Sequence, residues 1–132
     1  IKELALYDNA GGYGVAADLS HICSNCSVVG FEKEQELQSC LAKSDIVIIC
    51  VGNQTDEEAF KENSVVLKRL VNSIIQFTEN PIVCLLSNPI NALLPIIHQI
   101  YSKNGVNTDK IYGLATLDLI RSAINFNELL IG

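Results

Sequence analysis

Apolar residues along the chain follow two different patterns. Short uninterrupted runs, rich in β-branched residues and closed by Asp, Gly, Asn or Pro, indicate buried strands. Between these runs, apolar residues recur at a spacing of three and four, which predicts amphipathic helices. The expected strands cover residues 3–7, 27–31, 46–51, 82–86 and 111–114. The expected helices cover 15–22, 32–42, a stretch from the acidic residues 53–62 to Phe77, a stretch from Pro89 to Tyr101, and 116–130.

The alternation of strands and helices predicts the fold class. Apolar strands separated by helices form βαβ units with a parallel sheet, so we expect an α/β fold. The chain has 132 residues, of which 48% are hydrophobic, and its mean hydropathy is +0.27, which is high for a domain of this size. Either the strands are buried on both faces of the sheet, or part of the surface packs against further chain, and we expect both. Because residues 1–7 already read as a strand, we also expect the sequence to begin inside a domain.

Charge and composition exclude some classes of function. The net charge is −6, and neither a basic stripe nor many aromatic residues are present, which argues against a nucleic-acid partner. No apolar run approaches the roughly 18 residues that span a bilayer, so no membrane partner is expected. The five cysteines, an odd number, predict reduced thiols, and Cys50 and Cys84 are expected to act as small buried hydrophobes. Cys23 and Cys26 form a CxxC pair without a second pair, so no metal site is predicted.

Ligands of open parallel sheets bind beyond the carboxyl ends of the strands, and Asp8 lies at such a position. Its carboxylate could accept hydrogen bonds from both hydroxyls of an adenosine ribose, or it could simply be a turn residue. The glycines at 11, 12 and 14 follow it but do not form the GxGxxG fingerprint of a phosphate loop. Residues 3–7 therefore read as the second strand of a dinucleotide-binding domain, with the phosphate loop upstream.

Two further places carry candidate chemistry. Asn88 follows a predicted strand in the sequence SNPIN, where its amide could contact a ligand or could cap the next helix. Asp118 and Arg121 are three residues apart on a predicted helix and so share one face. They form either a surface ion pair of little energetic value or a pair with separate tasks. In the second case the carboxylate orients a catalytic imidazolium and the guanidinium binds a substrate carboxylate.

Four segments occur in an order that resembles the malate dehydrogenase branch of the NAD-dependent lactate/malate dehydrogenase family. They are LALYDNAGGYGVAADLSHI, SDIVIICVG, SNPINALLPI and GLATLDLIRSAINFNELL. The resemblance implies a partial doubly wound, Rossmann-like parallel sheet that lacks its first strand. It places residues 1–115 in the dinucleotide-binding domain and 116–132 at the start of the catalytic domain. It also implies NAD as cofactor, interconversion of malate and oxaloacetate, and a homo-oligomer, which is a dimer in the family. An intracellular location is expected, with the mitochondrion, the cytosol and other organelles left open.

The resemblance also assigns roles to individual residues. Asp8 resembles the ribose-binding acid, Asp118 the partner of the catalytic histidine, and Arg121 an arginine that binds the substrate dicarboxylate. The segments expected to face the cofactor comprise Val51, Gly52, Asn63, Leu86, Ser87 and Asn88, the last of which also meets substrate.

The chain departs from the family pattern at two places. The family carries a long loop with two arginines after the position of Gly52, whereas residues 53–62 are expected to form a shorter, acidic loop without arginine. The catalytic histidine has no counterpart, and His21 and His98 belong to no recognisable catalytic arrangement. We therefore expect the 132-residue chain to be inactive alone. Two alternatives stay open: a dehydrogenase for another 2-hydroxy acid, and a non-enzymatic relative that serves binding or assembly.

Overall fold

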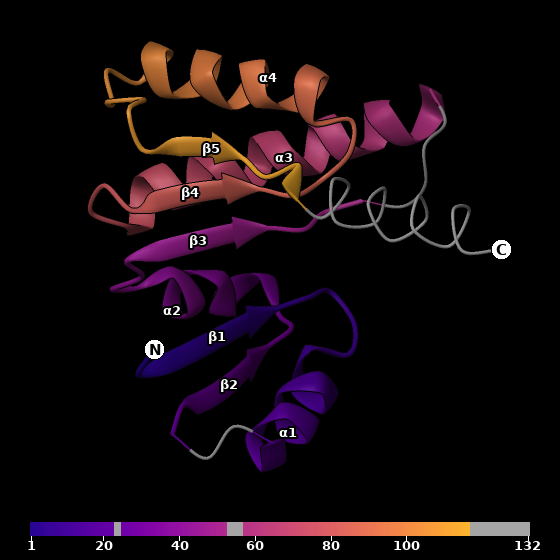
Figure 1. Ribbon diagram of the computed structural model, residues 1–132, viewed down its shortest axis with the longest axis vertical. Helices are drawn as coiled ribbons and strands as arrows, with labels where there is room; N and C mark the ends of the chain where they lie inside the picture. Colours follow the sequence, from indigo (N-terminus) through magenta and orange to yellow (C-terminus); the bar gives the residue numbers. More distant parts are fainter. Residues whose placement is uncertain (23–24, 53–56, 117–132) are drawn as a thin grey trace, which may run out of the picture. The chain divides into compact units, whose positions relative to one another are not determined.

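The computed structural model describes residues 1–22, 25–52 and 57–116 (Figure 1). Strands and helices alternate along the chain, as the hydrophobic pattern predicts. The elements are β1 (Glu3–Tyr7), α1 (Gly12–Ile22), β2 (Ser27–Phe31), the 3-10 helix η1 (Glu34–Glu36), α2 (Leu37–Leu41), β3 (Ile46–Ile49), α3 (Glu57–Phe77), β4 (Ile82–Leu85), α4 (Ile90–Lys103) and β5 (Ile111–Gly113).

Every strand pair of the structure is parallel, which confirms the α/β fold class. β1 pairs with β2, and Glu3 lies opposite Ser27. A second sheet has the order β3-β4-β5, with Ile46 opposite Ile82 and Val83 opposite Ile111. These pairings correspond to strands 2–3 and 4–5–6 of the doubly wound order 3-2-1-4-5-6. Strand 1 of that order has no counterpart among the strands of the described residues.

The chain divides into two compact units. Unit 1 comprises Ile1–Ser44 and Ser73–Glu79, and unit 2 comprises Asp45–Asn72 and Asn80–Gly132. Unit 1 is built on the β1-β2 pair with α1, and unit 2 on the three-stranded sheet with α4 and most of α3. Each unit therefore carries its own set of parallel strand ends.

One face of the unit 2 sheet forms a closed core. Val83 and Leu85 are fully buried on it, and α4 packs directly against the backbone of β5. A Cβ atom on Gly113 would lie 2.6 Å from Cγ2 of Ile90, so only glycine allows this approach. The helices complete this core with Leu67, Val71, Leu93 and Ile97.

The opposite face of the same sheet is open in the part of the chain that the structure describes. Ile46 and Ile48 are 56% and 58% exposed, because their side chains point away from the face that carries Leu85. The expectation of burial on both faces is therefore wrong for β3. It is also wrong for Cys50, which lies beyond the end of β3 and is exposed, whereas Cys84 is half-buried.

The first helix begins three residues earlier than its apolar spacing predicts. Gly12 lies on α1, and a Cβ atom on Gly30 of β2 would lie 2.5 Å from its carbonyl oxygen. This close backbone contact needs glycine on both sides, because a Cβ on Gly12 would also lie 2.5 Å from the carbonyl oxygen of Phe31. Gly12, which reads as part of a turn in the sequence, is thus the point where α1 packs on Gly30 of β2.

Two other expected boundaries also change. α3 begins at Glu57, so the expected loop over residues 53–62 is wrong from position 57 onward. Acidic residues are typical of a first helical turn, because the helix dipole is positive there. The helix expected over 32–42 is present as η1 and α2. Of the helix expected over 116–130, only Thr116 lies within the described residues.

Candidate functional site

Asp8 is the first residue after β1 and is exposed. Its backbone N–H donates to the carbonyl oxygen of Phe31 at 3.1 Å, which extends the strand pairing by one step. Its Oδ1 accepts a hydrogen bond from the backbone N–H of Ala10 at 3.2 Å. The carboxylate therefore starts the turn into α1 and also lies at the open carboxyl end of the sheet. This position is compatible with both roles that the sequence left open.

Glu32 occupies the equivalent position after β2, and the sequence interpretation missed it. Its Oε1 accepts hydrogen bonds from the backbone N–H groups of Gly11 and Tyr13, both at 3.1 Å. The first N–H groups of a helix have no partner within the helix, so this carboxylate satisfies them and complements the helix dipole. The available signal was an acid directly after a strand, the same criterion that selects Asp8.

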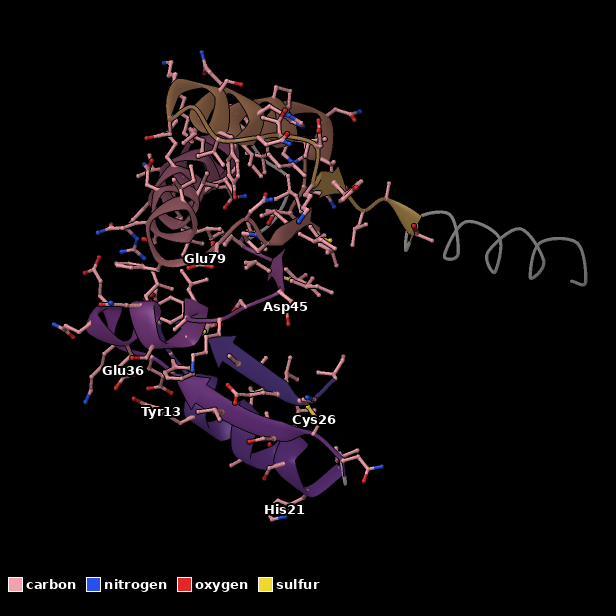
Figure 2. The ribbon with its side chains drawn as sticks, turned by 90° about the vertical axis from the view of Figure 1, so that its left-hand side faces the viewer. Tyr13, His21, Cys26, Glu36, Asp45 and Glu79 are labelled. Carbon is pink, nitrogen blue, oxygen red and sulfur yellow. The ribbon has the colours of Figure 1, made fainter. Side chains whose placement is uncertain are left out.

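A third acid, Glu36, completes the cluster at this end of unit 1. The Tyr13 hydroxyl donates to Glu36 Oε2 at 2.6 Å, and Figure 2 shows both labelled side chains. The same oxygen accepts from the backbone N–H groups of Glu32 at 3.1 Å and Lys33 at 3.2 Å. The hydrogen bond from Tyr13 lowers the pKa of Glu36, and in return it raises the pKa of Tyr13. Carboxylates thus dominate this strand end, which favours hydroxyl donors over anions.

Gly52 and Asn63 lie together beyond the end of β3 in unit 2. Gly52 has a φ of +136°, which side-chain-bearing residues rarely adopt. A Cβ atom at this position would lie 2.7 Å from Asn63 Nδ2. Asn63 is only 7% exposed although it is polar. Two residues that are eleven positions apart in the sequence, both assigned to the cofactor, are therefore in contact.

The segment after β4 runs beside the end of β3. The backbone N–H of Leu86 donates to the carbonyl oxygen of Ile49 at 2.9 Å, and the Ser87 hydroxyl donates to the same oxygen at 3.4 Å. Ser87 is buried, whereas Leu86 and Val51 are half-buried. The structure thus places Val51, Leu86 and Ser87 at one carboxyl edge with Gly52.

Asn88 is exposed at the same edge. The N-cap of α4 is Pro89, without a side-chain capping hydrogen bond, and the Asn88–Pro89 peptide bond is cis. The interpretation of Asn88 as a helix cap is therefore wrong. The interpretation of its amide as a ligand contact stays a prediction.

The remaining candidates are the pair Asp118 and Arg121 and the cysteines. Asp118, Arg121 and Cys23 lie outside the described residues. Cys26, Cys40, Cys50 and Cys84 are free thiols, and burial raises the pKa of Cys40 to about 11. Among residues 1–22, 25–52 and 57–116, no three metal-ligating side chains gather. No helix of this part of the chain is long and apolar enough to cross a membrane.

Sequence comparison places these features in a family. Residues 1–113 match the model of the lactate/malate dehydrogenase NAD-binding domain. The chain is 36% identical to mitochondrial malate dehydrogenase of Sus scrofa, over 98% of this chain and 40% of that protein. It is 38% identical to the mitochondrial malate dehydrogenase of Eucalyptus gunnii, over 92% of this chain and 37% of that protein. The chain thus spans about two fifths of the length of the curated relatives that it matches.

Solved structures show the same fold. Malate dehydrogenase from Plasmodium falciparum superposes with a TM-score of 0.73 at 23% identity, over 86% of this chain and 38% of that one. Lactate dehydrogenase from Eimeria maxima, solved with NADH and oxamate, gives a TM-score of 0.72 at 21% identity, over 86% of this chain and 36% of that one. Together, the matched residues and the fold show that this chain belongs to the lactate/malate dehydrogenase family, with residues 1–113 as its NAD-binding domain.

Proposed function

We propose that this chain is the NAD-binding part of an oxidoreductase that interconverts malate and oxaloacetate. The observation that carries the proposal is the 36% identity to malate dehydrogenases across 98% of the chain. The small-molecule partner is then a 2-hydroxy or 2-oxo acid. The same resemblance supports a homo-oligomer, an intracellular location and a second domain that begins at residue 116.

Each unit carries proposed cofactor contacts of its own. In unit 1, the exposed carboxylate of Asp8 accepts hydrogen bonds from the ribose hydroxyls. In unit 2, Gly52 has no side chain and lies in contact with the amide of Asn63. The missing side chain lets a cofactor lie against the main chain at this position. Val51, Leu86 and Ser87 line the same edge.

The bound nicotinamide supplies a hydride acceptor and donor. Around the substrate, the amide of Asn88 contacts an oxygen of the reacting carbon. Arg121 binds a substrate carboxylate in bidentate fashion, which its planar guanidinium allows. Asp118 orients the imidazole that takes the hydroxyl proton. The assignments of Asp118 and Arg121 rest on the sequence motif TLDLIR, since both lie outside the described residues.

A second candidate substrate follows from the short connection between β3 and α3. α3 begins at Glu57, and the segment from 53 to 68 contains no arginine, since the first arginine of the chain is Arg69. A dicarboxylate needs cationic contacts, and the acids of this stretch disfavour a second carboxylate. Lys61 offers a point charge without the bidentate geometry of arginine. The alternative is therefore a 2-oxo acid with a single carboxylate, and the third possibility is a non-enzymatic relative.

Steady-state kinetics of the complete natural protein separates these possibilities. Oxaloacetate, pyruvate and an aromatic 2-oxo acid are compared at matched NADH. A kcat/KM for oxaloacetate of about 10⁶ M⁻¹s⁻¹ or more supports malate as the substrate, since good enzymes reach this range. Preference for either of the other two acids supports the second candidate. No turnover with any of them contradicts a dehydrogenase. The 132-residue chain alone should be inactive, since loss of a general base costs roughly 10²–10⁴ in rate.

A further inference from the structure

We propose that Glu32 determines cofactor selectivity, because with Asp8 it excludes a ribose that carries a 2′-phosphate. The inference rests on the proposed function, since it concerns the same nucleotide-binding end of unit 1. It adds a residue that the family motifs do not assign and that acts on the phosphorylated cofactor.

Glu32 occupies the donors that a phosphate would use. Backbone N–H groups at the start of a helix, together with the helix dipole, commonly bind phosphate. At the start of α1, the N–H groups of Gly11 and Tyr13 both donate to one oxygen of Glu32 at 3.1 Å. The acceptor comes from 21 and 19 residues away in the sequence, so a carboxylate of the chain itself takes the place that a phosphate would occupy.

The carboxylate is held in place by its surroundings. The backbone N–H of Glu32 donates to Glu36 Oε2 at 3.1 Å, and the same oxygen accepts the Tyr13 hydroxyl at 2.6 Å. Contact between Gly12 and Gly30 sets the distance between α1 and β2, since neither position has room for a Cβ atom. Glu32 is half-buried, so its side chain has less freedom than a surface glutamate. A phosphate would have to displace this network to reach the two N–H groups.

Asp8 and Glu32 lie at adjacent strand ends. They follow Tyr7 and Phe31, which are opposite each other in the register, and the Asp8 N–H donates to the Phe31 carbonyl oxygen at 3.1 Å. An unphosphorylated ribose needs only acceptors here, which Asp8 provides. A phosphomonoester adds a charge of about −1.5 to −2 near pH 7 and meets two carboxylates. The second carboxylate therefore weakens binding of the phosphorylated cofactor by charge repulsion and does not weaken binding of the unphosphorylated one.

The test uses dissociation constants of NADH and NADPH for the complete natural protein and three variants. Glu32→Gln keeps the side chain and an acceptor oxygen but removes the charge. Glu32→Ala also releases the two N–H groups. Glu3→Gln is the matched control, because it removes one carboxylate at the amino end of β1, the opposite end of that strand from Asp8. Thermal unfolding of each variant establishes that it is folded.

We expect Glu32→Gln to strengthen NADPH binding at least about tenfold relative to NADH, which corresponds to about 1.4 kcal/mol. Glu32→Ala should strengthen it further, and Glu3→Gln should leave the ratio unchanged. In amide NMR spectra, 2′,5′-ADP should shift Gly11 and Tyr13 in Glu32→Ala and not in the wild type. If NADH binds and neither Glu32 variant changes the ratio, the inference about Glu32 is overturned and the proposed function stands. If the wild type binds neither cofactor, the proposed function fails and this inference fails with it.

Discussion

Units 1 and 2 both contain the carboxyl ends of parallel strands, but different kinds of residue follow these strands in the two units. In unit 1 the residues beyond β1 and β2 are carboxylates, Asp8 and Glu32, which hydrogen-bond to backbone N–H groups. In unit 2 the residues beyond β3 and β4 are a glycine with positive φ, a buried amide and a buried hydroxyl. Under the proposed function, charge selects the ligand at the strand ends of unit 1, and close approach to the backbone selects it at those of unit 2.

The buried leucines of the two units differ slightly in how much surface they keep exposed. Leu85 and Val83 of unit 2 are inaccessible to solvent, whereas the leucines of α2 in unit 1, Leu37 and Leu41, retain 5% and 6% exposure. A deep core suits a site that works by shape, because packing holds the backbone in place.

Removing a buried leucine should cost more in unit 2 than in unit 1. We expect Leu85→Ala to lower the free energy of unfolding by about 2–5 kcal/mol, since it leaves a cavity between β4 and the helices. Leu41→Ala, the matched substitution in unit 1, should cost less because Leu41 keeps 6% exposure, whereas Leu85 keeps none. Urea unfolding of both variants measures the difference. An equal or larger loss in Leu41→Ala would show that the two cores are not as different as their burial indicates.

Two glycines of unit 1 should respond in opposite directions to alanine. Gly30→Ala places a Cβ atom 2.5 Å from the Gly12 carbonyl oxygen, so we expect a loss of about 1–3 kcal/mol as α1 is pushed from β2. Gly14 lies within α1, and a Cβ atom there would have no neighbour within 4 Å. Gly14→Ala should therefore stabilise the protein by up to about 1 kcal/mol, because alanine favours a helix more than glycine does. Thermal unfolding of the pair provides the comparison. A neutral Gly30→Ala would mean that α1 and β2 can separate without loss.

The hydrogen bond between Tyr13 and Glu36 should stabilise the protein only within a limited pH range. Because the pKa of Glu36 is lowered from its usual 4.5, the contribution is present above that value and is lost as pH falls through the lowered pKa. Because the pKa of Tyr13 is raised from 10.0, the contribution is lost again as pH rises through the raised pKa. Tyr13→Phe should therefore lower the stability slightly near neutral pH, and this effect should shrink in acid as the pH falls through the lowered pKa of Glu36. Tyr13 is exposed and Glu36 is half-buried at the surface, so we expect this effect to be small.

Tyr112→Phe is the control for that measurement, because Tyr112 is an exposed tyrosine of unit 2. Its effect on stability should be the same near neutral pH and in acid. If the difference between wild type and Tyr13→Phe is independent of pH, the hydrogen bond to Glu36 is not formed in solution.

The sequence predicts the strands of unit 1 better than its first helix. The ranges 3–7 and 27–31 match β1 and β2, because apolar runs closed by turn residues are a local signal. The start of α1 depends on the contact between Gly12 and Gly30, which no local pattern reveals. Similarly, the acids at 57 and 58 read as a loop in isolation although they begin α3.

The candidate site shows the same limit. The family motifs predict Gly52 and Asn63 as residues of one site, and the structure brings them into contact. Glu32 belongs to no motif, and its role depends on hydrogen bonds to groups 19 and 21 residues away. Exposure of Ile46 and Ile48 could not be predicted either, since an apolar run does not tell which face the helices cover.

We propose that the carboxylates beyond β1 and β2 select the cofactor by charge, and titration of NADH and NADPH into the complete natural protein measures this selection. We predict that the wild type binds NADH at least about tenfold more tightly than NADPH. Asp8→Asn should reduce that preference, because the amide no longer repels a 2′-phosphate and accepts fewer hydrogen bonds from the ribose hydroxyls. Equal or tighter binding of NADPH by the wild type, or a preference that Asp8→Asn leaves unchanged, would show that these carboxylates do not select the cofactor by charge.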